Sequence, residues 1–405
     1  MKKMTKKIIY ITGSFPFGKS EVWVINELNS LQELGNEITI IPRSGKGEII
    51  NQGATKFAPN LIDLPFINWA ICIFFLRTIL FKPFLFLKLL VEIINQSNSF
   101  IELLKGLAVL PKSLFLVKIL KSQKVDHVHS LSTTSVAVMA YIISSNLKVP
   151  WSYTLHSSSI INSKYKRSFL FRSHSVSKIR TISQKITNDL SNFIGPSLSK
   201  KISMVHLGVD IKGFIKEKTI INDPLIIATP AELNLQKGHI YALDAAKKLI
   251  DKGVSNFKWF FYGSGPLFNE FQKKVIELNL INHCYFPGNV DNTKLLNKYK
   301  NHEVDIVILA SINTPDAFEG IPVSLMEAMS YEIPVIATNS GGTEELVDNE
   351  SGILVNQKDS EALVNAILQL RNNPEYQRKI GKNGRNKIKQ DFDTIKNAND
   401  LIKLF

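Results

Sequence analysis

The sequence predicts an α/β protein made of two Rossmann-like, doubly wound domains. Its 405 residues are enough for two domains of about 200 residues each. Short apolar runs of strand length alternate with longer stretches of helical periodicity, a pattern typical of a parallel sheet covered by helices. The alternation starts near residue 8 and starts again near residue 225, after a polar, basic stretch from 215 to 223. This repeat predicts two sheets.

The composition is that of a globular chain with a basic surface. Hydrophobic residues make up 44% and charged residues 21%, and the net charge is +14. A basic surface attracts nucleic acid, anionic lipid or phosphorylated substrates. The sequence has no Arg-rich tract interleaved with aromatic residues, so nucleic acid is not expected as a partner. The two cysteines, Cys72 and Cys284, lie in apolar surroundings and are expected to be buried thiols in a reducing compartment.

The N-terminus has the basic start of a signal peptide without its apolar segment. Lysines crowd residues 2 to 7, but the apolar run at 8–11 is too short for a signal peptide. We therefore expect a cytoplasmic chain that opens on a β-strand.

The first domain is predicted to open with a strand, a loop and a helix. The strand covers 8–12, the loop runs from Gly13 to Ser20, and apolar residues then recur at helical spacing up to Leu34. A second strand at 38–41 completes a βαβ unit. Ligands of such sheets bind at the carboxyl ends of the strands, so this loop is expected to face the ligand.

Two histidines lie at or near strand ends in the same domain. Residues 125–129 are predicted to form a strand, 132–143 a helix of small residues, and 149–155 a strand that ends at His156. His156 is therefore a candidate site residue, with a purely structural role as the alternative. His129 is a weaker candidate that on the alternative interpretation pairs within the fold.

The segment from 64 to 124 is both apolar and basic. Its uninterrupted apolar run, 64–76, is shorter than the roughly 20 residues that span a bilayer. If 84–96 is a helix, its polar residues share one narrow face. Between Arg77 and Lys124 there are eight basic and two acidic residues. Two interpretations stay open: helices that cover the sheet, or a surface that lies in a membrane interface.

Two carboxylates eight positions apart, Glu319 and Glu327, flank a Gly-Ile-Pro junction in the second domain. Good helix formers follow Pro322, so Glu319 is expected on the loop before a helix and Glu327 about one turn inside it. The first N–H groups of that helix would be unpaired at the positive end of its dipole. Such a junction favours the binding of an anion such as a diphosphate.

The other expected elements of this domain surround the two carboxylates. Strands are predicted at 225–229, 259–262 and 304–310, with a helix at 238–249. The strand at 259–262 closes on Gly263-Ser264-Gly265-Pro266, and Pro266 is expected in the first turn of the next helix. The strand at 304–310 is apolar throughout, as in a buried parallel sheet.

These residues resemble the carboxyl-terminal signature of glycosyltransferase family 4, a family with the GT-B fold. The resemblance rests on the E-x7-E spacing and on Ile333-Pro334-Val335, Gly341-Gly342 and Gly352-Ile353-Leu354-Val355 in that order. It extends to Gly263-x-Gly265, to the strand ending in Thr-x-His156, and to the Phe-Pro and Ser-Glu pattern of the first loop. A GT-B fold implies two Rossmann-like domains facing each other across a cleft. Here these would be residues 1–214 and 215–390, with a helix at 391–405 crossing back to the first.

The resemblance implies a role for each matching residue. His156, Glu319 and Lys237 would be catalytic, with Lys237 on the diphosphate and the other two near the transferred sugar. Glu327 would accept hydrogen bonds from the ribose hydroxyls. The positions expected to bind the donor are Gly18, Lys19, Glu232, Gly263, Gly265, Val290, Gly320, Ile321, Pro322, Val323 and Glu327. No cofactor and no metal are expected, and the Asp391–Asp393 pair is interpreted as coincidence.

One position departs from the family pattern. Where the family has an Arg that holds the diphosphate, this sequence has Glu232, while Lys237 is retained. A carboxylate close to a diphosphate would repel it. Either Glu232 points away and another cation substitutes, with His239 and Lys19 as candidates, or donor binding is impaired.

The sequence therefore predicts a retaining glycosyltransferase of bacterial surface polysaccharide biosynthesis. It would move a sugar from a nucleotide-diphosphate sugar, UDP-linked in preference to GDP-linked, to a hydroxyl of a saccharide or lipid-linked oligosaccharide. The alternative is a catalytically impaired paralogue that binds nucleotide sugar or acts as a scaffold. A phosphorylase would need a pyridoxal phosphate lysine in a recognisable setting, which the sequence lacks, and an epimerase would act without acceptor. Peripheral contact with an anionic membrane, at the inner face of the plasma membrane, stays open.

Overall fold

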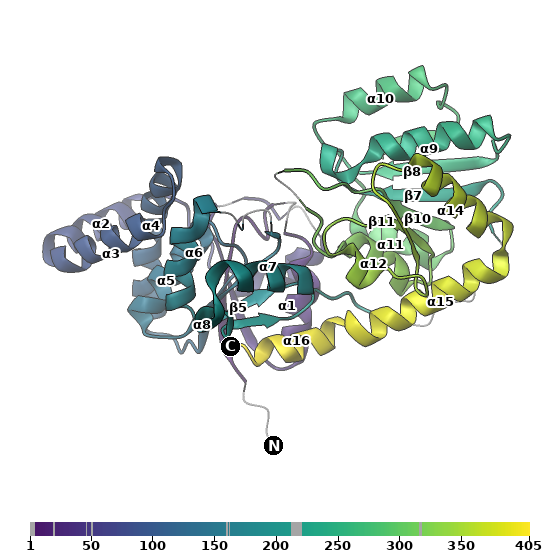
Figure 1. Cartoon of the computed structure of the whole chain (residues 1–405). Coiled ribbons are helices and arrows are strands. Elements are labelled where there is room, and N and C mark those ends of the chain that lie inside the picture. Colours follow the sequence, from purple (N-terminus) through teal and green to yellow (C-terminus); the bar gives the residue numbers. More distant parts are fainter. Residues whose placement is uncertain are drawn as a thin grey trace. The chain divides into compact units, whose positions relative to one another are not determined.

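The computed structural model describes residues 5–18, 21–45, 47–49, 52–158, 161, 163–211, 221–315 and 318–405. The chain forms two compact units, each with its own parallel sheet. Unit 1 comprises Met1–His206 together with Ile395–Phe405, and unit 2 comprises Leu207–Thr394 (Figure 1).

Unit 1 is built on a six-stranded parallel sheet with the order β2-β1-β3-β4-β5-β6. The strands are β1 (Lys7–Thr12), β2 (Glu37–Pro42), β3 (His127–Ser130), β4 (Trp151–Leu155), β5 (Lys178–Thr181) and β6 (Ile202–Met204). Every residue of β3 and β4 is buried, as expected for a parallel sheet covered on both faces. The strands predicted at 8–12, 38–41 and 149–155 are thereby confirmed.

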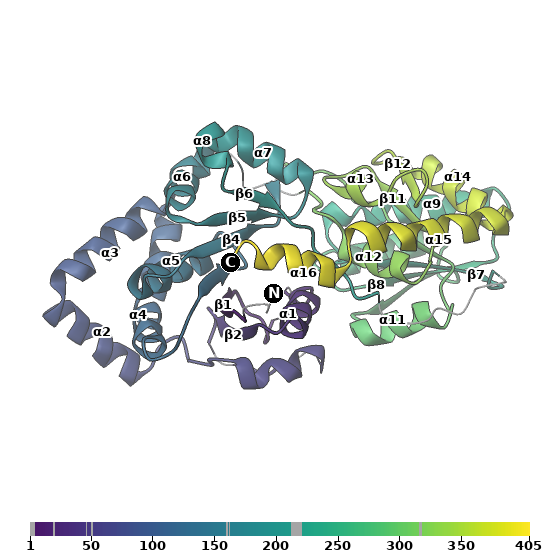
Figure 2. The ribbon, with the colours of Figure 1, turned by 90° about the horizontal axis from the view of Figure 1, so that it is seen from below.

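Helices cover both faces of this sheet (Figure 2). On one face, α1 (Val24–Glu33) and α16 (Thr394–Ile402) share an apolar core with β1 and β2. On the other face, α5 (Ser135–Leu147) packs on β1, β3 and β4, and α4 (Phe100–Leu120) packs on α5. The other helical segments are η1 (Gln52–Asn60), α2 (Trp69–Phe81), α3 (Pro83–Asn95), η3 (Ser163–Tyr165), α6 (Lys166–Ser175), α7 (Gln184–Ile194) and α8 (Pro196–Ser199).

Local sequence explains where several of these helices begin. The side chains of Asn68, Ser99 and Ser183 each accept a hydrogen bond from a backbone N–H in the first turn of α2, α4 and α7. These caps supply an acceptor to a donor that has no intrahelical partner. Within α1, Val24, Leu28 and Leu31 recur at helical spacing, and all three are fully buried. The amphipathic pattern thus turns this helix towards the sheet.

The segment 395–405 adds the last piece of the unit 1 core. Leu401 is fully buried among residues of α1 and β1. The ring of Phe405 lies 4.8 Å from the ring of His127 and 6.2 Å from that of Tyr10, measured between centroids. Figures 1 and 2 both draw α16 beside this sheet. A terminal helix therefore fills the face that α1 leaves uncovered.

Unit 2 is built on a second six-stranded parallel sheet, with the order β12-β11-β10-β7-β8-β9. The strands are β7 (Leu225–Pro230), β8 (Phe257–Tyr262), β9 (Cys284–Gly288), β10 (Ile306–Leu309), β11 (Val335–Thr338) and β12 (Ile353–Val355). The helical segments are η4 (Leu235–Lys237), α9 (His239–Asp251), α10 (Phe268–Glu277), α11 (Asn292–Lys300), α12 (Val323–Ser330), α13 (Thr343–Leu346), α14 (Ser360–Asn372) and α15 (Pro374–Asp391). Two Rossmann-like, doubly wound domains were predicted, and the two sheets confirm them.

Two details differ from the expectations. Helix α10 begins at Phe268, so Pro266 lies in the turn before it and not in its first turn. Pro322 is the N-cap of α12, one position before the helix, and Glu327 is then the fifth helical residue, as predicted. Most of the polar stretch at 215–223 lies outside the described residues.

Candidate functional site

The carboxylate of Glu319 lies on the loop between β10 and α12 and is held by two side chains. The Nζ atom of Lys237 donates to both carboxylate oxygens, at 2.9 and 2.8 Å. Ser311 Oγ donates to Oε2 at 2.8 Å. Lys237 follows β7 and Ser311 follows β10, and these strands are neighbours. Their carboxyl ends meet at one edge of the sheet, which brings together residues far apart in the sequence.

This ion pair is shielded unevenly. The side chain of Glu319 is 8% exposed and that of Lys237 is 20% exposed. The ammonium group can therefore receive a further acceptor while the carboxylate stays covered. Ser311 was not identified from the sequence, because a serine after an apolar strand carries no distinctive signal.

Glu327 is buried on α12 and is held by Asn292, the first residue of α11. Asn292 Nδ2 donates to Glu327 Oε1 at 2.7 Å. Burial raises the pKa of Glu327 to about 7, and the hydrogen bond from Asn292 opposes this rise. The group is therefore divided between its neutral and ionised forms near neutral pH. Asn292 is a second residue that sequence reasoning missed, since 35 positions separate it from Glu327.

The junction before α12 is fixed by close backbone contacts. Gly341 has φ +60°, and a Cβ there would lie 1.8 Å from the carbonyl oxygen of Glu319. Gly342 N donates to the carbonyl oxygens of Glu319 and Gly320, at 3.2 and 3.1 Å. A side chain at position 341 would therefore push the loop after β11 away from Glu319. Ile321 and Pro322 are buried, and Gly320 and Val323 are half-buried. Helix α12 begins at Val323, four residues after Glu319.

Glu232 lies outside this cluster. Its side chain is exposed, and its Oε2 atom accepts a hydrogen bond from Asn234 Nδ2 at 3.1 Å. The backbone carbonyl of Glu232 accepts from the ring of His239, at 2.9 Å from Nε2. The side chain at the position of the family Arg therefore points to solvent and to its own loop.

His239 does not supply the missing cation, so that alternative is wrong. The ring is 1% exposed, and burial lowers its pKa to about 4. The imidazole is therefore neutral near pH 7 and donates to the Glu232 carbonyl through Nε2. The other candidate, Lys19, lies outside the described residues.

The remaining donor-side positions are on the loops after β8 and β9. A Cβ at Gly263 would lie 2.1 Å from the carbonyl oxygen of Ala231, and one at Gly265 would lie 2.4 Å from that of Leu233. Val290, beyond β9, is half-buried. The two glycines thus allow the loop after β8 to pack directly on the loop after β7, which carries Glu232 and leads to Lys237.

In unit 1, the loop after β1 is wrapped around a carboxylate of its own chain. The N–H groups of Gly13, Ser14 and Phe15 donate to Glu21 at 2.9, 2.8 and 2.8 Å. Gly18 is half-buried, and its N–H donates to the Ser14 carbonyl at 3.0 Å. The backbone donors that would suit an anionic ligand in residues 13–15 are therefore already occupied. Glu21 gives the Ser-Glu pattern a structural role that the sequence did not reveal.

His156 follows β4, at the carboxyl edge of the unit 1 sheet. Its Nε2 atom lies 3.1 Å from the carbonyl oxygen of Leu131, so this nitrogen carries the hydrogen and Nδ1 is the acceptor. The ring lies 4.5 Å from the ring of Trp23. Burial, and then the nearby charge of Arg180, lower the pKa of His156 to about 3. His156 is therefore a fixed neutral imidazole.

His129 belongs to the core of unit 1. Its Nδ1 lies 2.8 Å from Ser152 Oγ, and its Nε2 lies 2.9 Å from Thr154 Oγ1. The ring is fully buried, 5.1 Å from the ring of Phe405. Both ring nitrogens are used within the fold, which favours the structural alternative for this residue.

A cavity of about 170 Å³ opens in unit 1 between α4, α5 and α6. It lies near the start of α5, just after β3, and hence at the carboxyl edge of the sheet. Its lining combines polar side chains with a larger apolar and aromatic surface, and it includes Gln96, Glu102, Lys105, Thr133, Ser135, Tyr165, Phe169 and Arg172. Gln96 is 1% exposed, and neither polar atom of its side chain has a hydrogen-bond partner.

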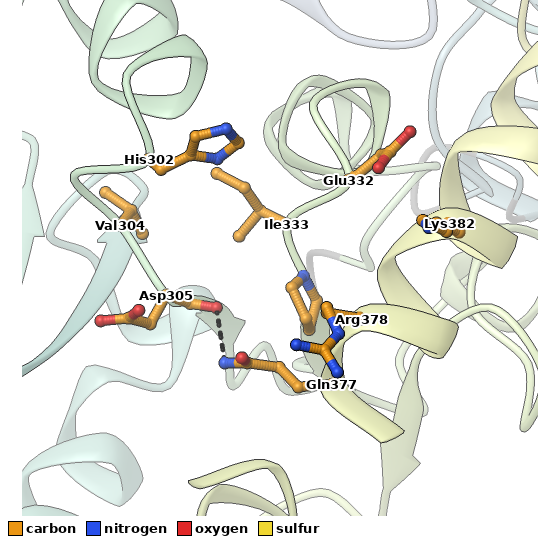
Figure 3. Close-up of a pocket in the computed structure, with 9 residues that line it drawn as sticks. His302, Val304, Asp305, Glu332, Ile333, Gln377, Arg378 and Lys382 are labelled. Carbon is orange, nitrogen blue, oxygen red and sulfur yellow. Dashed lines mark hydrogen bonds between the residues drawn. The ribbon is translucent and has the colours of Figure 1, made fainter. Parts of the chain in front are cut away.

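A smaller cavity in unit 2, of about 30 Å³, lies at the opposite edge of that sheet. Figure 3 shows its lining, in which Gln377 Nε2 donates to the carbonyl of Asp305 at 3.4 Å. Asp305 and Ile333 precede β10 and β11, so the cavity is at the amino ends of the strands. It is therefore separate from the Lys237–Glu319 cluster, which lies at their carboxyl ends.

Metal ligands do not gather in the part of the chain that the structure describes. No group of three or more His, Cys, Asp or Glu side chains there is placed to hold an ion. Asp393 follows the end of α15 and forms a backbone bridge with Val209. The chemistry available at the unit 2 edge is thus that of a lysine, two carboxylates and helix N–H groups.

Comparison with known proteins supports this assignment of fold. The chain resembles the crystal structure of Anabaena Alr3699/HepE in complex with UDP, with a TM-score of 0.71 and 16% identity, over 98% of this chain and 99% of that one. The fold is therefore GT-B, as the sequence predicts. Residues 210–387, which carry the Lys237–Glu319 cluster, match the family model described as glycosyl transferases group 1.

Curated relatives match over part of their length. The chain is 32% identical over 200 residues to the putative colanic acid biosynthesis glycosyltransferase WcaL of Escherichia coli (strain K12), covering 48% of each protein. It is 27% identical over 218 residues to the UDP-Gal:alpha-D-GlcNAc-diphosphoundecaprenol alpha-1,3-galactosyltransferase of Escherichia coli, covering 51% of this chain and 54% of that protein. The chain thus spans about half the length of the curated relatives it matches.

Proposed function

We propose that this protein is a retaining glycosyltransferase of bacterial surface polysaccharide biosynthesis. It transfers a sugar from a nucleotide-diphosphate sugar to a hydroxyl of a saccharide or lipid-linked oligosaccharide. The observation that carries the proposal is the cluster at the carboxyl edge of the unit 2 sheet. There, a partly exposed lysine, a covered carboxylate and the start of α12 converge within the segment that matches the family model.

The diphosphate of the donor binds Lys237 and the first N–H groups of α12. The side chain of Lys237 is 20% exposed and its ammonium group is already within 2.9 Å of Glu319, so this group can hold a phosphate oxygen and the carboxylate together. Helix N–H groups at the positive end of the dipole add directed donors. As the bond to the sugar breaks, negative charge grows on the leaving diphosphate, and these preorganised donors stabilise it.

Glu327 accepts hydrogen bonds from the ribose hydroxyls. Two hydroxyl donors are best matched by an ionised carboxylate, which offers acceptors only. Asn292 already occupies Oε1, which fixes the orientation of the carboxylate. Because the pKa of Glu327 is raised to about 7, donor binding is expected to favour the ionised form and to release a proton below that pH.

Glu319 orients the transferred sugar, and no protein nucleophile is required. Its Oε1 and Oε2 both bind Lys237, and Oε2 also binds Ser311, so the carboxylate is fixed when the sugar hydroxyls arrive. The acceptor hydroxyl attacks the anomeric carbon from the face on which the diphosphate leaves. The bond from the sugar to the diphosphate breaks, and the hydroxyl proton passes to the departing diphosphate, which gives retention. The acceptor itself binds to unit 1, for which the cavity of about 170 Å³ with its hydroxyl-rich and aromatic lining is the best candidate.

The exposed position of Glu232 explains how this site tolerates a carboxylate. The side chain bonds to Asn234 and points to solvent, where water screens its repulsion of a diphosphate. The site then has one cation from this loop where the family has two. We expect weaker donor binding than with the family Arg, but an intact site.

The test is calorimetric titration of UDP and of GDP into the purified protein and into Lys237→Met and Glu327→Gln. Matched controls are Lys258→Met, an exposed lysine at the start of β8, and Glu270→Gln, an exposed glutamate on α10. We expect one nucleotide to bind, UDP by preference, at least tenfold weaker in the two site variants and unchanged in the controls. If neither nucleotide binds the folded wild type, the scaffold alternative becomes the better one.

Stereochemistry is tested separately, by the anomeric configuration of the product. With a UDP-α-sugar donor and an oligosaccharide acceptor, proton NMR of the new linkage should show the α-anomer. A β-linkage would contradict retention and leave the donor site as proposed.

A further inference from the structure

Unit 1 exposes many large apolar side chains within one short segment. Thirteen of the seventeen large hydrophobic residues that are exposed in the described chain lie between Ile67 and Leu104. Trp69 is 84% exposed, Phe81 79% and Phe84 86%. Exposed apolar residues normally occur singly on a protein surface, and a concentration of this kind marks an interaction surface.

These residues form one continuous stripe on each of two helices. The stripe on α2 is spaced by four, three and four residues, and that on α3 by three, four and three: Trp69, Ile73, Leu76 and Leu80, then Phe84, Leu87, Val91 and Ile94. Such spacing places the residues of each stripe on one helix face. A different and smaller set is buried against the protein, namely Ile71 and Thr78 on α2 and Leu89 and Ile93 on α3. Packing within unit 1 therefore accounts for one apolar face and not for the other.

The two helices meet at a sharp bend that carries three strongly exposed apolar residues. Helix α2 ends at Phe81 and α3 begins at Pro83, and the chain is bent by 107° between them. Leu80, Phe81 and Phe84 surround this bend. Figure 2 shows α2 and α3 outside α4, on the side of unit 1 away from the strands. The pair thus forms an apolar projection.

The exposed charges around the stripes are all basic. Arg77, Lys82, Lys88 and Lys105 are exposed, whereas Glu92 and Glu102, the acidic residues between Ile67 and Lys105, are half-buried. Glu92 lies 3.8 Å from Lys88, and Glu102 accepts hydrogen bonds from the backbone and side chain of Asn98. The surface therefore offers positive charge beside apolar side chains.

Neither α2 nor α3 is long enough to span a membrane by itself. In the described part of the chain, no single helix is long and apolar enough to cross a bilayer, although α2 and α3 pass that test as a bent pair. Each has 13 residues, against the roughly 20 needed to span the hydrocarbon core. Helices of this length with an apolar face and basic flanks suit the interface plane of a membrane.

We propose that α2, α3 and the first turns of α4 dock unit 1 onto a membrane leaflet rich in anionic phospholipid. The apolar stripes enter the boundary between headgroups and acyl chains, and the four basic residues bind the headgroup phosphates. A second copy of the chain is the less suitable occupant, because it would bring the same basic residues against each other. This proposal is independent of glycosyl transfer, since membrane docking requires neither donor nor acceptor.

Sedimentation of the full chain with extruded vesicles tests the proposal. We expect binding to vesicles of phosphatidylcholine with 30 mol% phosphatidylglycerol and much weaker binding to phosphatidylcholine alone. Leu80→Asp and Phe84→Asp should each reduce the partition coefficient at least tenfold. Arg77→Gln should reduce it about fivefold on the anionic vesicles and leave binding to the neutral ones unchanged. The matched control is Ile276→Asp, at a position 61% exposed on α10, which should bind as the wild type does.

Tryptophan fluorescence gives a second measurement that does not depend on sedimentation. Trp69 should shift to shorter wavelength on anionic vesicles, and the shift should disappear in Trp69→Phe. Brominated acyl chains should quench this emission. Absence of vesicle binding by the folded wild type, or binding unaffected by Leu80→Asp and Phe84→Asp, would overturn the proposal. So would a dimer in sedimentation equilibrium that these two variants dissociate, since the surface would then pair copies of the chain.

Discussion

Each unit contains a largely covered ion pair, and the two pairs differ in what their charges can still bind. In unit 1, Arg180 pairs with Glu27, and the two side chains are 1% and 8% exposed. Arg180 also donates to the carbonyls of Val205 and His206, at 3.0 Å each, and Tyr10 donates to Glu27 at 2.9 Å. In unit 2, Lys237 pairs with Glu319 and is 20% exposed at the carboxyl edge of the sheet.

The difference separates an enclosed charge from one that can still take a ligand. The guanidinium of Arg180 is enclosed by protein acceptors, so it links α1 to β5 and to the chain after β6. The ammonium of Lys237 has room for a ligand oxygen. Burial and pairing alone therefore do not identify an active-site charge, and the exposure of the cation distinguishes the two pairs.

Removing the unit 1 cation should give the largest effect, and on stability. Arg180→Met leaves the buried carboxylate of Glu27 without its counter-ion, so we expect a loss of about 3–5 kcal/mol in the free energy of unfolding of unit 1. Urea denaturation followed by circular dichroism measures this. The double variant Arg180→Met with Glu27→Gln should recover part of the loss. A single variant as stable as the wild type would contradict the structural role.

Removing the unit 2 cation should act on turnover. Lys237→Met is expected to lower kcat/KM for sugar transfer about 10²–10³-fold, because one donor to the developing charge is lost. Its free energy of unfolding should fall by less than that of Arg180→Met, because the lysine side of the pair is partly exposed and Ser311 still donates to the carboxylate of Glu319. Lys258→Met provides the control for both measurements. A large loss of stability with normal turnover would contradict this prediction, because Lys237 would then have a structural role like that of Arg180.

The raised pKa of Glu327 predicts that the stability of unit 2 and its affinity for nucleotide both depend on pH. Folding raises this pKa from 4.5 to about 7, so between these values the folded state binds more protons than the unfolded state. Glu327 alone should therefore lower the stability of unit 2 as pH rises from about 4.5 to about 7, by on the order of 2–3 kcal/mol. His239, whose pKa is lowered to about 4 by burial, acts in the opposite direction over much of this range, so the Glu327 contribution is the difference between the wild type and Glu327→Gln. Nucleotide affinity should rise over the upper part of the same range as Glu327 ionises.

Urea denaturation and calorimetry at pH 5, 6, 7 and 8 check both trends. In Glu327→Gln the stability of unit 2 should rise with pH relative to the wild type and the trend in nucleotide affinity should flatten, whereas the control Glu270→Gln should follow the wild type in both. A stability profile of Glu327→Gln that runs parallel to that of the wild type would show that Glu327 does not titrate as proposed.

Restoring the family residue at position 232 should give the smallest effect. Glu232→Arg replaces an exposed carboxylate with a cation on the loop that leads to Lys237, so we expect UDP to bind about three- to tenfold more tightly at low ionic strength. Titration at low and high salt checks this, since the gain should shrink with salt. An unchanged affinity at low salt would mean that the side chain at position 232 cannot reach the diphosphate.

The sequence was most informative where function rests on a local segment. The E-x7-E spacing placed Glu319 on a loop and Glu327 in a helix, and the structure agrees, because a helix start depends on nearby residues. The partners of these carboxylates could not be predicted. Asn292, Ser311 and Lys237 reach them through strand order, which no local pattern contains.

The burial and the contacts of individual side chains could not be predicted from the sequence either. His239 looked like a substitute cation, but its pKa depends on burial that tertiary packing creates. Glu21 closes the first loop with three N–H groups, a contact that needs the loop to be folded. In the segment 64–124, the apolar and basic composition was clear, but only the packing of α2 and α3 shows which stripe is left exposed.

The C-terminal segment of unit 1 has a consequence for the order in which the chain folds. Residues 395–405 complete the core around Tyr10 and His127, but the ribosome makes them only after the whole of Leu207–Thr394. At the usual rate of synthesis this takes about 10–40 s, during which one face of the first sheet lacks its last helix. Unit 2 has all its strands by then. The unit that is translated first is therefore the one that completes its core last.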